Sequence, residues 1–142
     1  MDPMKDDLGY LISRTSHELR AVLAEGLHNH GLDDASYIAL FYTQRAGDAG
    51  ISTRAMAESR KELFDAISET AQRLVRDGWV TEQPIAGDRE SKLLQLTPKA
   101  VAVVPLLVDA AHWAIERALS GFSDEELSEL TSYLERMRTN LR

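Results

Sequence analysis

The sequence predicts a mainly α-helical fold with one small β-hairpin, and three observations support this fold class. Apolar residues recur at spacings of three and four near both ends of the chain, which is the period of a helix buried on one face. Two short runs rich in strand-forming residues, 79–83 and 92–96, flank a loop with Pro84, Gly87 and Asp88. Residues 51–96 therefore predict, in order, a short helix, a longer helix and a hairpin, which is the order of a winged helix-turn-helix.

Length and composition favour one domain. The chain of 142 residues is long enough to bury a core. It contains no cysteine, which excludes disulfides and thiolate metal sites and fits a reducing compartment. Its first residues lack a secretory-signal pattern, and no apolar run approaches the roughly 18 residues that cross a membrane. We therefore expect a cytoplasmic protein without a membrane partner.

The charge is unevenly distributed. The net charge is −7, which does not favour binding to nucleic acid. Residues 51–100, however, carry 8 basic and 8 acidic groups, whereas residues 1–50 carry 4 and 8, and residues 101–142 carry 4 and 7. The predicted winged helix-turn-helix, an architecture that places one helix in a groove of DNA, is thus neutral. The excess of acid lies in the terminal segments.

The first two helices follow from apolar spacing and capping residues. A long helix is predicted over 6–29, with Leu8, Leu11 and Leu19 on its apolar stripe. Asp33 or Asp34 can cap a second helix that runs to about Arg45. Its inward residues are predicted to be Ile38, Phe41 and Tyr42.

The third and fourth helices form the predicted helix-turn-helix. Ser52 is a predicted N-cap for a helix that ends near Glu58. Ser59 and Glu62 have the spacing of a capping box, which predicts a fourth helix over 60–77. Gly78 then supplies the left-handed stop. The inward face of the fourth helix is predicted to hold Leu63, Ile67, Ala71 and Leu74.

The C-terminal part predicts two more helices. Thr97 and Pro98 start the fifth, since proline is tolerated in a first turn, and Gly121 ends it. Ser123 and Glu126 predict a capping box for the last helix, with Phe122 able to pack on Leu127. Apolar residues then repeat at spacings of 3, 4, 3 and 4, which is an a/d seam over two heptads. These residues are Leu127, Leu130, Leu134, Met137 and Leu141.

This seam has two interpretations, intrachain packing and a dimer interface. The terminal helices present more apolar surface than the small winged module can cover, which favours the dimer. The predicted interface residues are Leu8, Leu11, Ile115, Leu119, Leu127, Leu130, Leu134, Met137 and Leu141.

The ordered set of motifs resembles the MarR family of bacterial transcriptional regulators over essentially the whole chain. The residues that carry the resemblance are Met56-Ala57, the segment RLVRDGWV with Leu74 and Gly78, Asp88-Arg89, Leu96-Thr97, and the segment GFSDEELSEL.

The resemblance implies a single domain in which residues 33–97 form the winged module and 6–31 and 98–142 form dimerisation helices. It implies a homodimeric repressor-like regulator that binds a pseudo-palindromic operator in double-stranded DNA. The 60–77 helix would enter the major groove and the 79–96 wing would lie at the minor groove. It also implies modulation by a small aromatic or lipophilic ligand.

The predicted DNA-binding residues follow from polar and basic side chains near these elements. Arginine and lysine suit guanine and phosphates, glutamine suits adenine, and hydroxyls suit phosphates. The predicted set is Ser52, Thr53, Arg54, Arg60, Lys61, Ser68, Gln72, Arg73, Arg89 and Lys92.

Acidic residues on the same surface weigh against strong binding. Glu62, Asp65 and Glu69 do not suit a surface that faces phosphates, and Glu90 stands where the family usually has a wing arginine. A one-residue slip in the hairpin would let Arg89 replace it. The alternative is a degenerate family member that has lost DNA binding and acts through protein contacts.

Other functions have little support in the sequence. On the family pattern, an effector pocket would lie among the first, second and fifth helices, lined by Tyr10, His17, Tyr37, Phe41, His112 and Trp113. Glu25, His28, His30 and His112 are the most plausible metal ligands, but no motif supports them, so we expect neither a metal nor a cofactor. No catalytic motif is present, which predicts that the chain is not an enzyme.

Overall fold

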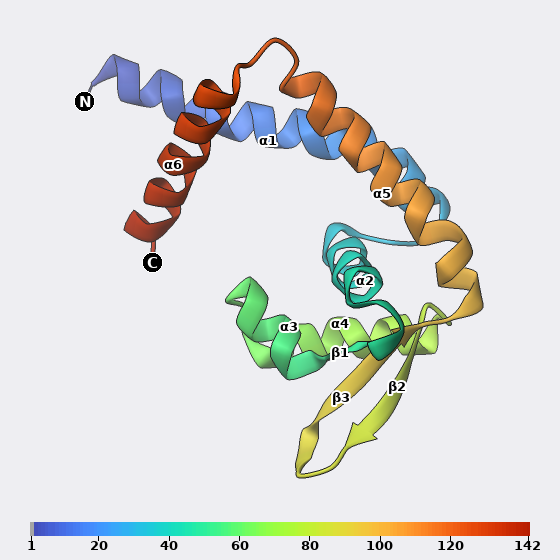
Figure 1. Ribbon diagram of the computed structural model, residues 1–142. Coiled ribbons are helices and arrows are strands. Elements are labelled where there is room, and N and C mark those ends of the chain that lie inside the picture. The colour runs from blue at the N-terminus through green and yellow to red at the C-terminus, as the bar shows by residue number, and fades with distance from the viewer. Residues whose placement is uncertain (1) are drawn as a thin grey trace.

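The computed structural model describes residues 2–142 and confirms a mainly helical winged fold with a small antiparallel sheet (Figure 1). Its elements are α1 (Pro3–Asn29), α2 (Asp34–Ala46), the 3-10 helix η1 (Gly47–Ala49), β1 (Ile51–Ser52), α3 (Thr53–Arg60), α4 (Phe64–Arg76), β2 (Val80–Ile85), β3 (Asp88–Leu96), α5 (Pro98–Ala118) and α6 (Asp124–Asn140).

One apolar core joins the winged module to α5. Its fully buried members include Leu40 of α2, Met56 of α3, Leu74 of α4, Leu94 of β3 and Val104 of α5. Burying a side chain of this size contributes roughly 1.5–3 kcal/mol. Because each of these elements supplies a buried side chain, the core fixes α4 and the sheet relative to the long helix α5.

The sheet has three strands in the order β1-β3-β2. The sequence did not predict β1, because a strand of two residues is too short to show alternation. Its Ile51 pairs with Leu94 of β3. The hairpin strands are longer than predicted and leave only a tight turn at Gly87, whose φ is +82°. Pro84 lies inside β2, which tolerates a missing N–H because it is an edge strand.

The predicted helix caps are largely confirmed. Ser52 accepts a hydrogen bond from the Ala55 amide, Thr97 caps α5, and Ser123 forms the full capping box with Glu126. Asp33 is the residue that caps α2. α1 starts earlier than predicted, at Pro3, because the Asp2 side chain accepts from the Met4 amide.

The end of α4 is also as predicted. Gly78 has a φ of +79°, its amide donates to the Val75 carbonyl at 3.1 Å, and the Trp79 amide donates to the Leu74 carbonyl at 2.9 Å. This pair of bonds is a Schellman motif, which satisfies the last carbonyls of the helix.

The predicted start of α4 is wrong. Helix α3 runs on to Arg60, so Ser59 has helical backbone and does not cap a new helix. Lys61 then adopts a left-handed conformation, with a φ of +54°, and breaks the helix. α4 begins at Phe64 after Leu63, which has extended backbone, and the Leu63 side chain is 80% exposed rather than buried.

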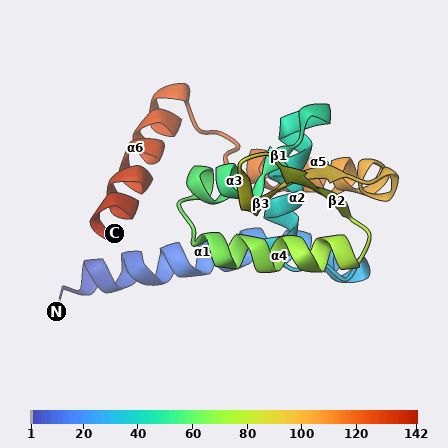
Figure 2. The ribbon, with the colours of Figure 1, turned by 90° about the horizontal axis from the view of Figure 1, so that it is seen from below.

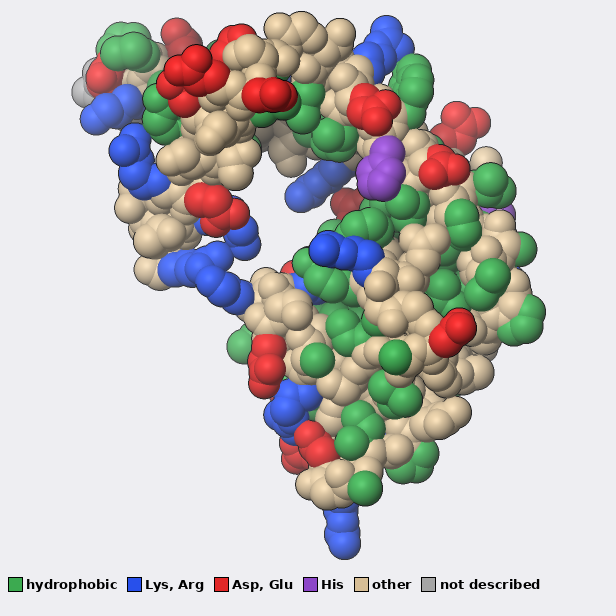
Figure 3. Space-filling view, in the orientation of Figure 1, with side chains coloured by type: hydrophobic (Ala, Val, Ile, Leu, Met, Phe, Trp, Pro, Cys, Tyr) green, Lys and Arg blue, Asp and Glu red, His purple; other side chains and the backbone are tan. Residues whose placement is uncertain are grey.

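The terminal helices extend away from the winged module. α1 and α5 run side by side, whereas α6 stands apart from the module in both ribbon views (Figures 1 and 2). None of the residues of α6 is buried. The space-filling view shows an open gap between this arm and the module (Figure 3). The apolar stripe that was predicted for α6 therefore has no partner within the described residues 2–142.

Contrary to the sequence expectation, α5 is long enough and apolar enough to cross a membrane by length and composition. The core helix of a soluble protein passes the same test. α5 packs against α1 and α2 and buries Val104, Leu107 and Val108 in the core. The length and apolar composition of α5 are therefore weak evidence for a membrane span.

Gly50→Ala is expected to destabilise the fold. Gly50 has a φ of +74°, and an added Cβ would lie 2.6 Å from the Leu94 carbonyl oxygen. Backbone strain of this kind costs about 1–3 kcal/mol. We expect a loss of about 2 kcal/mol or more in the free energy of unfolding, measured by urea denaturation at a fixed protein concentration.

Gly9→Ala is the matched control for this substitution. An added Cβ at Gly9 meets nothing within 4 Å in α1. Alanine is favoured over glycine inside a helix by about 0.5–1 kcal/mol, so this variant should be slightly stabilised. Equal unfolding midpoints for the two variants would contradict the close approach at Gly50.

Candidate nucleic-acid interface

The outward face of α4 is mixed in charge. Ile67, Thr70, Ala71 and Leu74 are buried against the core. The opposite face is exposed and consists of Asp65, Ala66, Glu69, Gln72 and Arg76. Two carboxylates, an amide and a guanidinium can accept from or donate to base edges, but the face carries no excess of positive charge.

Two residues that were predicted on this surface lie at its sides instead. The Arg73 guanidinium donates to the Asp33 carboxylate at 3.1 Å and lies 3.4 Å from the Thr70 hydroxyl. The Ser68 hydroxyl is buried and has no hydrogen-bond partner in the described structure. The sequence predicted Arg73 on this outward face, but its long side chain reaches sideways to the N-cap of α2.

Asp33 is held in its charged form by this arrangement. The Ser36 amide donates to its carboxylate at 2.8 Å and is the main cause that lowers the pKa of Asp33, and Arg73 lowers it further. The ion pair thus joins α4 to the start of α2.

The turn between α3 and α4 holds Arg60 in place. Its guanidinium pairs with Glu62 and lies 5.6 Å from the centre of the Tyr42 ring. Lys61, by contrast, is exposed at the left-handed turn. Neither residue belongs to α4, as the predicted 60–77 helix required.

The hydroxyls at the start of α3 are already engaged. Ser52 caps the helix, and Thr53 is only 2% exposed. The Thr53 hydroxyl lies 3.3 Å from that of Ser91 and accepts from the Lys92 amide at 3.1 Å. These contacts fasten α3 to β3, so Thr53 is a structural residue rather than an exposed phosphate ligand.

Arg54, Asp88 and Phe64 form a wing clamp between α3, the wing and α4. The Arg54 guanidinium donates to both carboxylate oxygens of Asp88, at 2.7 and 3.2 Å, and lies 4.6 Å from the centre of the Phe64 ring. The hydrogen bond from Arg54 is the main cause that lowers the pKa of Asp88 to about 2, and the Ser91 amide adds to it. The clamp orients the hairpin relative to both helices.

The wing tip presents one basic side chain. Pro84 pairs with Lys92 and Ile85 with Asp88, which leaves Arg89 and Glu90 outside the regular register. Arg89 is exposed and is the basic residue of the tip segment 86–90, and Figure 3 shows a basic side chain projecting there. The Glu90 carboxylate lies 3.8 Å from the Arg54 guanidinium, so its charge is partly compensated.

A cavity lies between α1, α2 and α5, the three helices where the family resemblance implies an effector pocket. The cavity has a volume of about 210 Å³. Its lining residues are Leu19, Arg20, Leu23, Asp34, Tyr37, Ile38, Ala111, Ala114 and Ile115. The Arg20 and Asp34 side chains are 3.8 Å apart, and burial raises the pKa of Tyr37.

Of the six predicted pocket residues, only Tyr37 lines this cavity. Phe41 packs on the core beside Tyr37, with ring centres 6.4 Å apart, and Trp113 is 54% exposed beneath Arg117. Tyr10, His17 and His112 are exposed. No sequence pattern pointed to Arg20, because a lone arginine on a helix is more often a surface residue.

Among residues 2–142, no group of three or more histidine, aspartate or glutamate side chains is arranged to hold a metal ion.

Comparison with curated proteins finds helix-turn-helix regulators. The chain is 37% identical over 76 residues to the HTH-type transcriptional regulator PecS of Dickeya dadantii (strain 3937), a match that covers 53% of this chain and 45% of PecS. It is 30% identical over 92 residues to the uncharacterized HTH-type transcriptional regulator YybA of Bacillus subtilis (strain 168), covering 65% and 61%. The matches thus span less than two thirds of either relative. No family model matches the chain.

Solved structures match over nearly the whole chain. A MarR transcriptional regulator from Methanosarcina mazei Go1 aligns with a TM-score of 0.73 at 24% identity, covering 95% of this chain and 96% of the other. The S. aureus MepR–DNA complex aligns with a TM-score of 0.80 at 19% identity, covering 93% and 96%. The chain has the winged-helix fold of MarR-family regulators.

The wing clamp is expected to make the stability of the fold depend on pH. Because the pKa of Asp88 is about 2 in the folded state and 3.8 is its ordinary value, the clamp stabilises the fold fully above about pH 4. This stabilisation is lost as the pH falls through 2. An NMR titration of the Asp88 carboxyl should give a midpoint near 2, and Arg54→Gln should return it toward 3.8.

Arg14→Gln is the control, since Arg14 pairs with Glu18 on α1 and should leave the Asp88 midpoint unchanged. A midpoint near 3.8 in the unaltered protein would show that the clamp does not form in solution.

Proposed function

We propose that this chain is a homodimeric transcriptional regulator of the MarR type that binds a pseudo-palindromic DNA operator. The observation that carries the proposal is the exposed face of α4 beside an exposed wing arginine, on a fold shared with a regulator solved on DNA. In this proposal residues 33–97 are the DNA-binding module, and 6–31 and 98–142 are the dimerisation helices.

The unpartnered apolar surface of the terminal helices supports the dimer. In α1, Leu8 and Leu11 are 52% and 56% exposed. Ile115 of α5 and the α6 residues Leu134, Met137 and Leu141 are also exposed, and Leu119, Leu127 and Leu130 are only half-buried. Exposed apolar surface of this extent is rare on monomers. A second copy of the chain could cover it with the same surface, as two-fold symmetry requires.

The dimer proposal predicts the effect of a charge in the seam. Leu134→Glu should bury a carboxylate in the interface, which is strongly unfavourable. Sedimentation equilibrium should then give the chain mass of 15.8 kDa, whereas the unaltered protein should give twice that mass.

Ser132→Glu is the matched control, because Ser132 lies on the opposite side of α6 from the seam and is exposed. This variant should stay dimeric. An unaltered protein that sediments as a monomer at micromolar concentration would end the proposal.

DNA contact is proposed for the exposed side chains of this surface. Gln72 suits an adenine edge in the major groove, Lys61 suits a phosphate, and Arg89 suits the minor groove. Arg76 suits a guanine edge, and its exposed pair with Asp77, 3.6 Å away, would give way to that contact. The other predicted contacts, including Arg54, Arg60 and Arg73, hold the interface in shape through their ion pairs. Ser52 and Lys92 remain proposed contacts to the DNA phosphate backbone at the edge of this surface.

The DNA proposal predicts salt-sensitive binding to the region upstream of the protein's own gene. Titration at two salt concentrations should give a complex at low salt that weakens at high salt, because phosphate contacts release counterions. Arg89→Ala should weaken binding about tenfold or more, since a good base or groove contact contributes roughly 1–3 kcal/mol.

Arg117→Ala is the control for Arg89→Ala, because it removes an exposed arginine near the far end of α5. This variant should bind the upstream DNA as tightly as the unaltered protein does. Absence of any complex at low salt would overturn the proposal.

Ligand modulation is proposed at the cavity between α1, α2 and α5. A small aromatic carboxylate could place its ring among Leu19, Leu23 and Tyr37 and its charge on Arg20. It would then compete with Asp34 for Arg20. Because Asp34 adjoins Asp33, which pairs with Arg73 of α4, such a ligand would act next to the attachment of the recognition helix.

The acidic residues of α4 favour a second candidate function. Asp65 and Glu69 are exposed on the outward face and repel phosphates. If these carboxylates prevent DNA binding, the chain is a degenerate family member that acts through protein contacts.

In either case we propose a cytoplasmic, non-enzymatic protein, in line with the regulators named among its relatives.

A further inference from the structure

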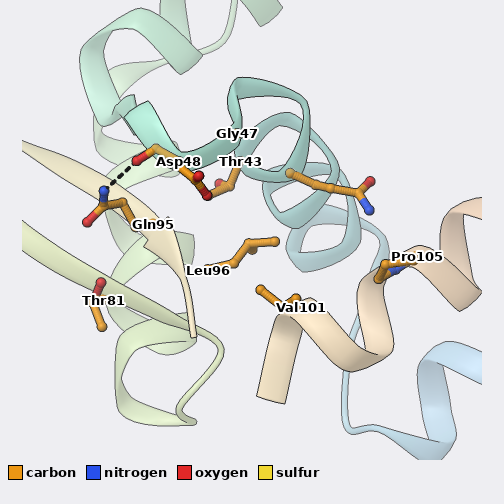
Figure 4. A pocket seen from close by; sticks show the side chains of 9 residues that line it. Thr43, Gly47, Asp48, Thr81, Gln95, Leu96, Val101 and Pro105 are labelled. Carbon is orange, nitrogen blue, oxygen red and sulfur yellow. Dashed lines mark hydrogen bonds between the residues drawn. The ribbon is translucent and has the colours of Figure 1, made fainter. Parts of the chain in front are cut away.

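A second and larger cavity lies at the C-terminal end of α2, where the winged module meets the start of α5 (Figure 4). Its volume is about 440 Å³. The lining residues come from the end of α2, η1, β2, β3 and the first turns of α5. They are Thr43, Gln44, Gly47, Asp48, Thr81, Gln95, Leu96, Val101 and Pro105.

The polar groups of this cavity are mainly acceptors. Asp48 is its one ionisable lining residue, and its carboxylate takes part in none of the ion pairs found among residues 2–142. The Gln95 amide nitrogen donates to the Asp48 carbonyl at 2.8 Å, as the dashed line in Figure 4 shows, and the Gln95 side-chain oxygen accepts from the Gln83 amide at 3.5 Å. The Thr43 hydroxyl donates to the Ala39 carbonyl at 2.8 Å and is almost fully buried, so Thr43 closes the wall and does not offer an accessible acceptor.

Pro105 adds a further acceptor. Within a helix, the amide of residue 105 would donate to the carbonyl of Val101, one turn earlier. Proline has no N–H, so this carbonyl loses its regular partner. Both residues line the cavity, and the freed carbonyl belongs to the turn of α5 that forms its wall.

The remaining wall is apolar. Leu96, Val101 and Pro105 lie together across the cavity from Asp48 (Figure 4). The Val101 side chain is 58% exposed. An apolar surface opposite a free carboxylate suits a molecule with an apolar body and a charged end that donates hydrogen bonds.

We propose that this cavity binds a small organic cation, a primary ammonium or amidinium attached to a short apolar or aromatic body. The charged group donates to the Asp48 carboxylate, since charge-assisted bonds are the strongest available there. The apolar body packs on Leu96, Val101 and Pro105.

The site differs in chemistry from the cavity between α1, α2 and α5. That cavity has Arg20 on its wall and suits an anion, whereas this one has no lysine, arginine or histidine among its lining residues. A cation and an anion of the same shape should therefore go to different sites. The proposal depends on neither DNA binding nor the effector proposed above.

The test is a titration of the ¹⁵N-labelled full chain with benzylammonium, benzyl alcohol and benzoate, which share a ring and differ in charge. Benzylammonium should shift the amide signals of Gly47, Asp48 and Val101 and bind at least about tenfold more tightly than benzyl alcohol. Asp48→Asn should weaken benzylammonium binding by about tenfold or more. Val101→Phe, at an exposed position, should fill the cavity and abolish the shifts.

Asp34→Asn is the matched control, because it removes a carboxylate from the other cavity and should leave benzylammonium binding unchanged. The proposal is overturned if benzylammonium does not bind, if Asp48→Asn binds it equally well, or if benzoate shifts the same amides. Because no DNA is present, these outcomes are independent of whether the protein binds an operator.

Discussion

The arrangement of the whole winged module depends on the burial of a few large side chains in one core. Leu40, Met56, Leu74 and Leu94 come from four different elements and are all but inaccessible to solvent. Their packing sets the rotation of α4, because Leu74 must face inward together with Ile67 and Ala71. Once this face is fixed, the helical period decides that Asp65, Glu69, Gln72 and Arg76 face outward. The surface offered to a partner is thus a consequence of the core.

Ion pairs then decide which of the arginines near this surface stay free. Arg73 is bound to Asp33 and Arg54 to Asp88, so two of the cations that the sequence predicts as DNA contacts have structural partners. Both arginines are partly exposed, and exposed pairs of this kind contribute little to stability. These pairs act on the geometry of the module. The Arg73–Asp33 pair ties α4 to α2, and the Arg54–Asp88 pair orients the wing. The remaining surface is less basic than its arginine content suggests.

The two cavities lie near opposite ends of α2 and have opposite chemistry. One places Arg20 beside apolar residues of α1, α2 and α5, and the other places Asp48 opposite Leu96 and Val101. Both lie where the long helices meet the winged module.

The sequence by itself determined the fold class, the helix caps at Ser52, Thr97 and Ser123, and the stop at Gly78. These features depend on hydrogen bonds between residues at most a few positions apart, so local spacing is sufficient to predict them. Local spacing failed at Ser59 and Leu63, because the left-handed turn at Lys61 overrode a capping-box pattern. Only the tertiary structure decided that Arg73 meets Asp33 and Arg54 meets Asp88, pairs that are 40 and 34 residues apart. Such contacts, and the cavity at Asp48, exist only after the core has set how the elements are rotated against one another, and no periodicity in the chain encodes that rotation.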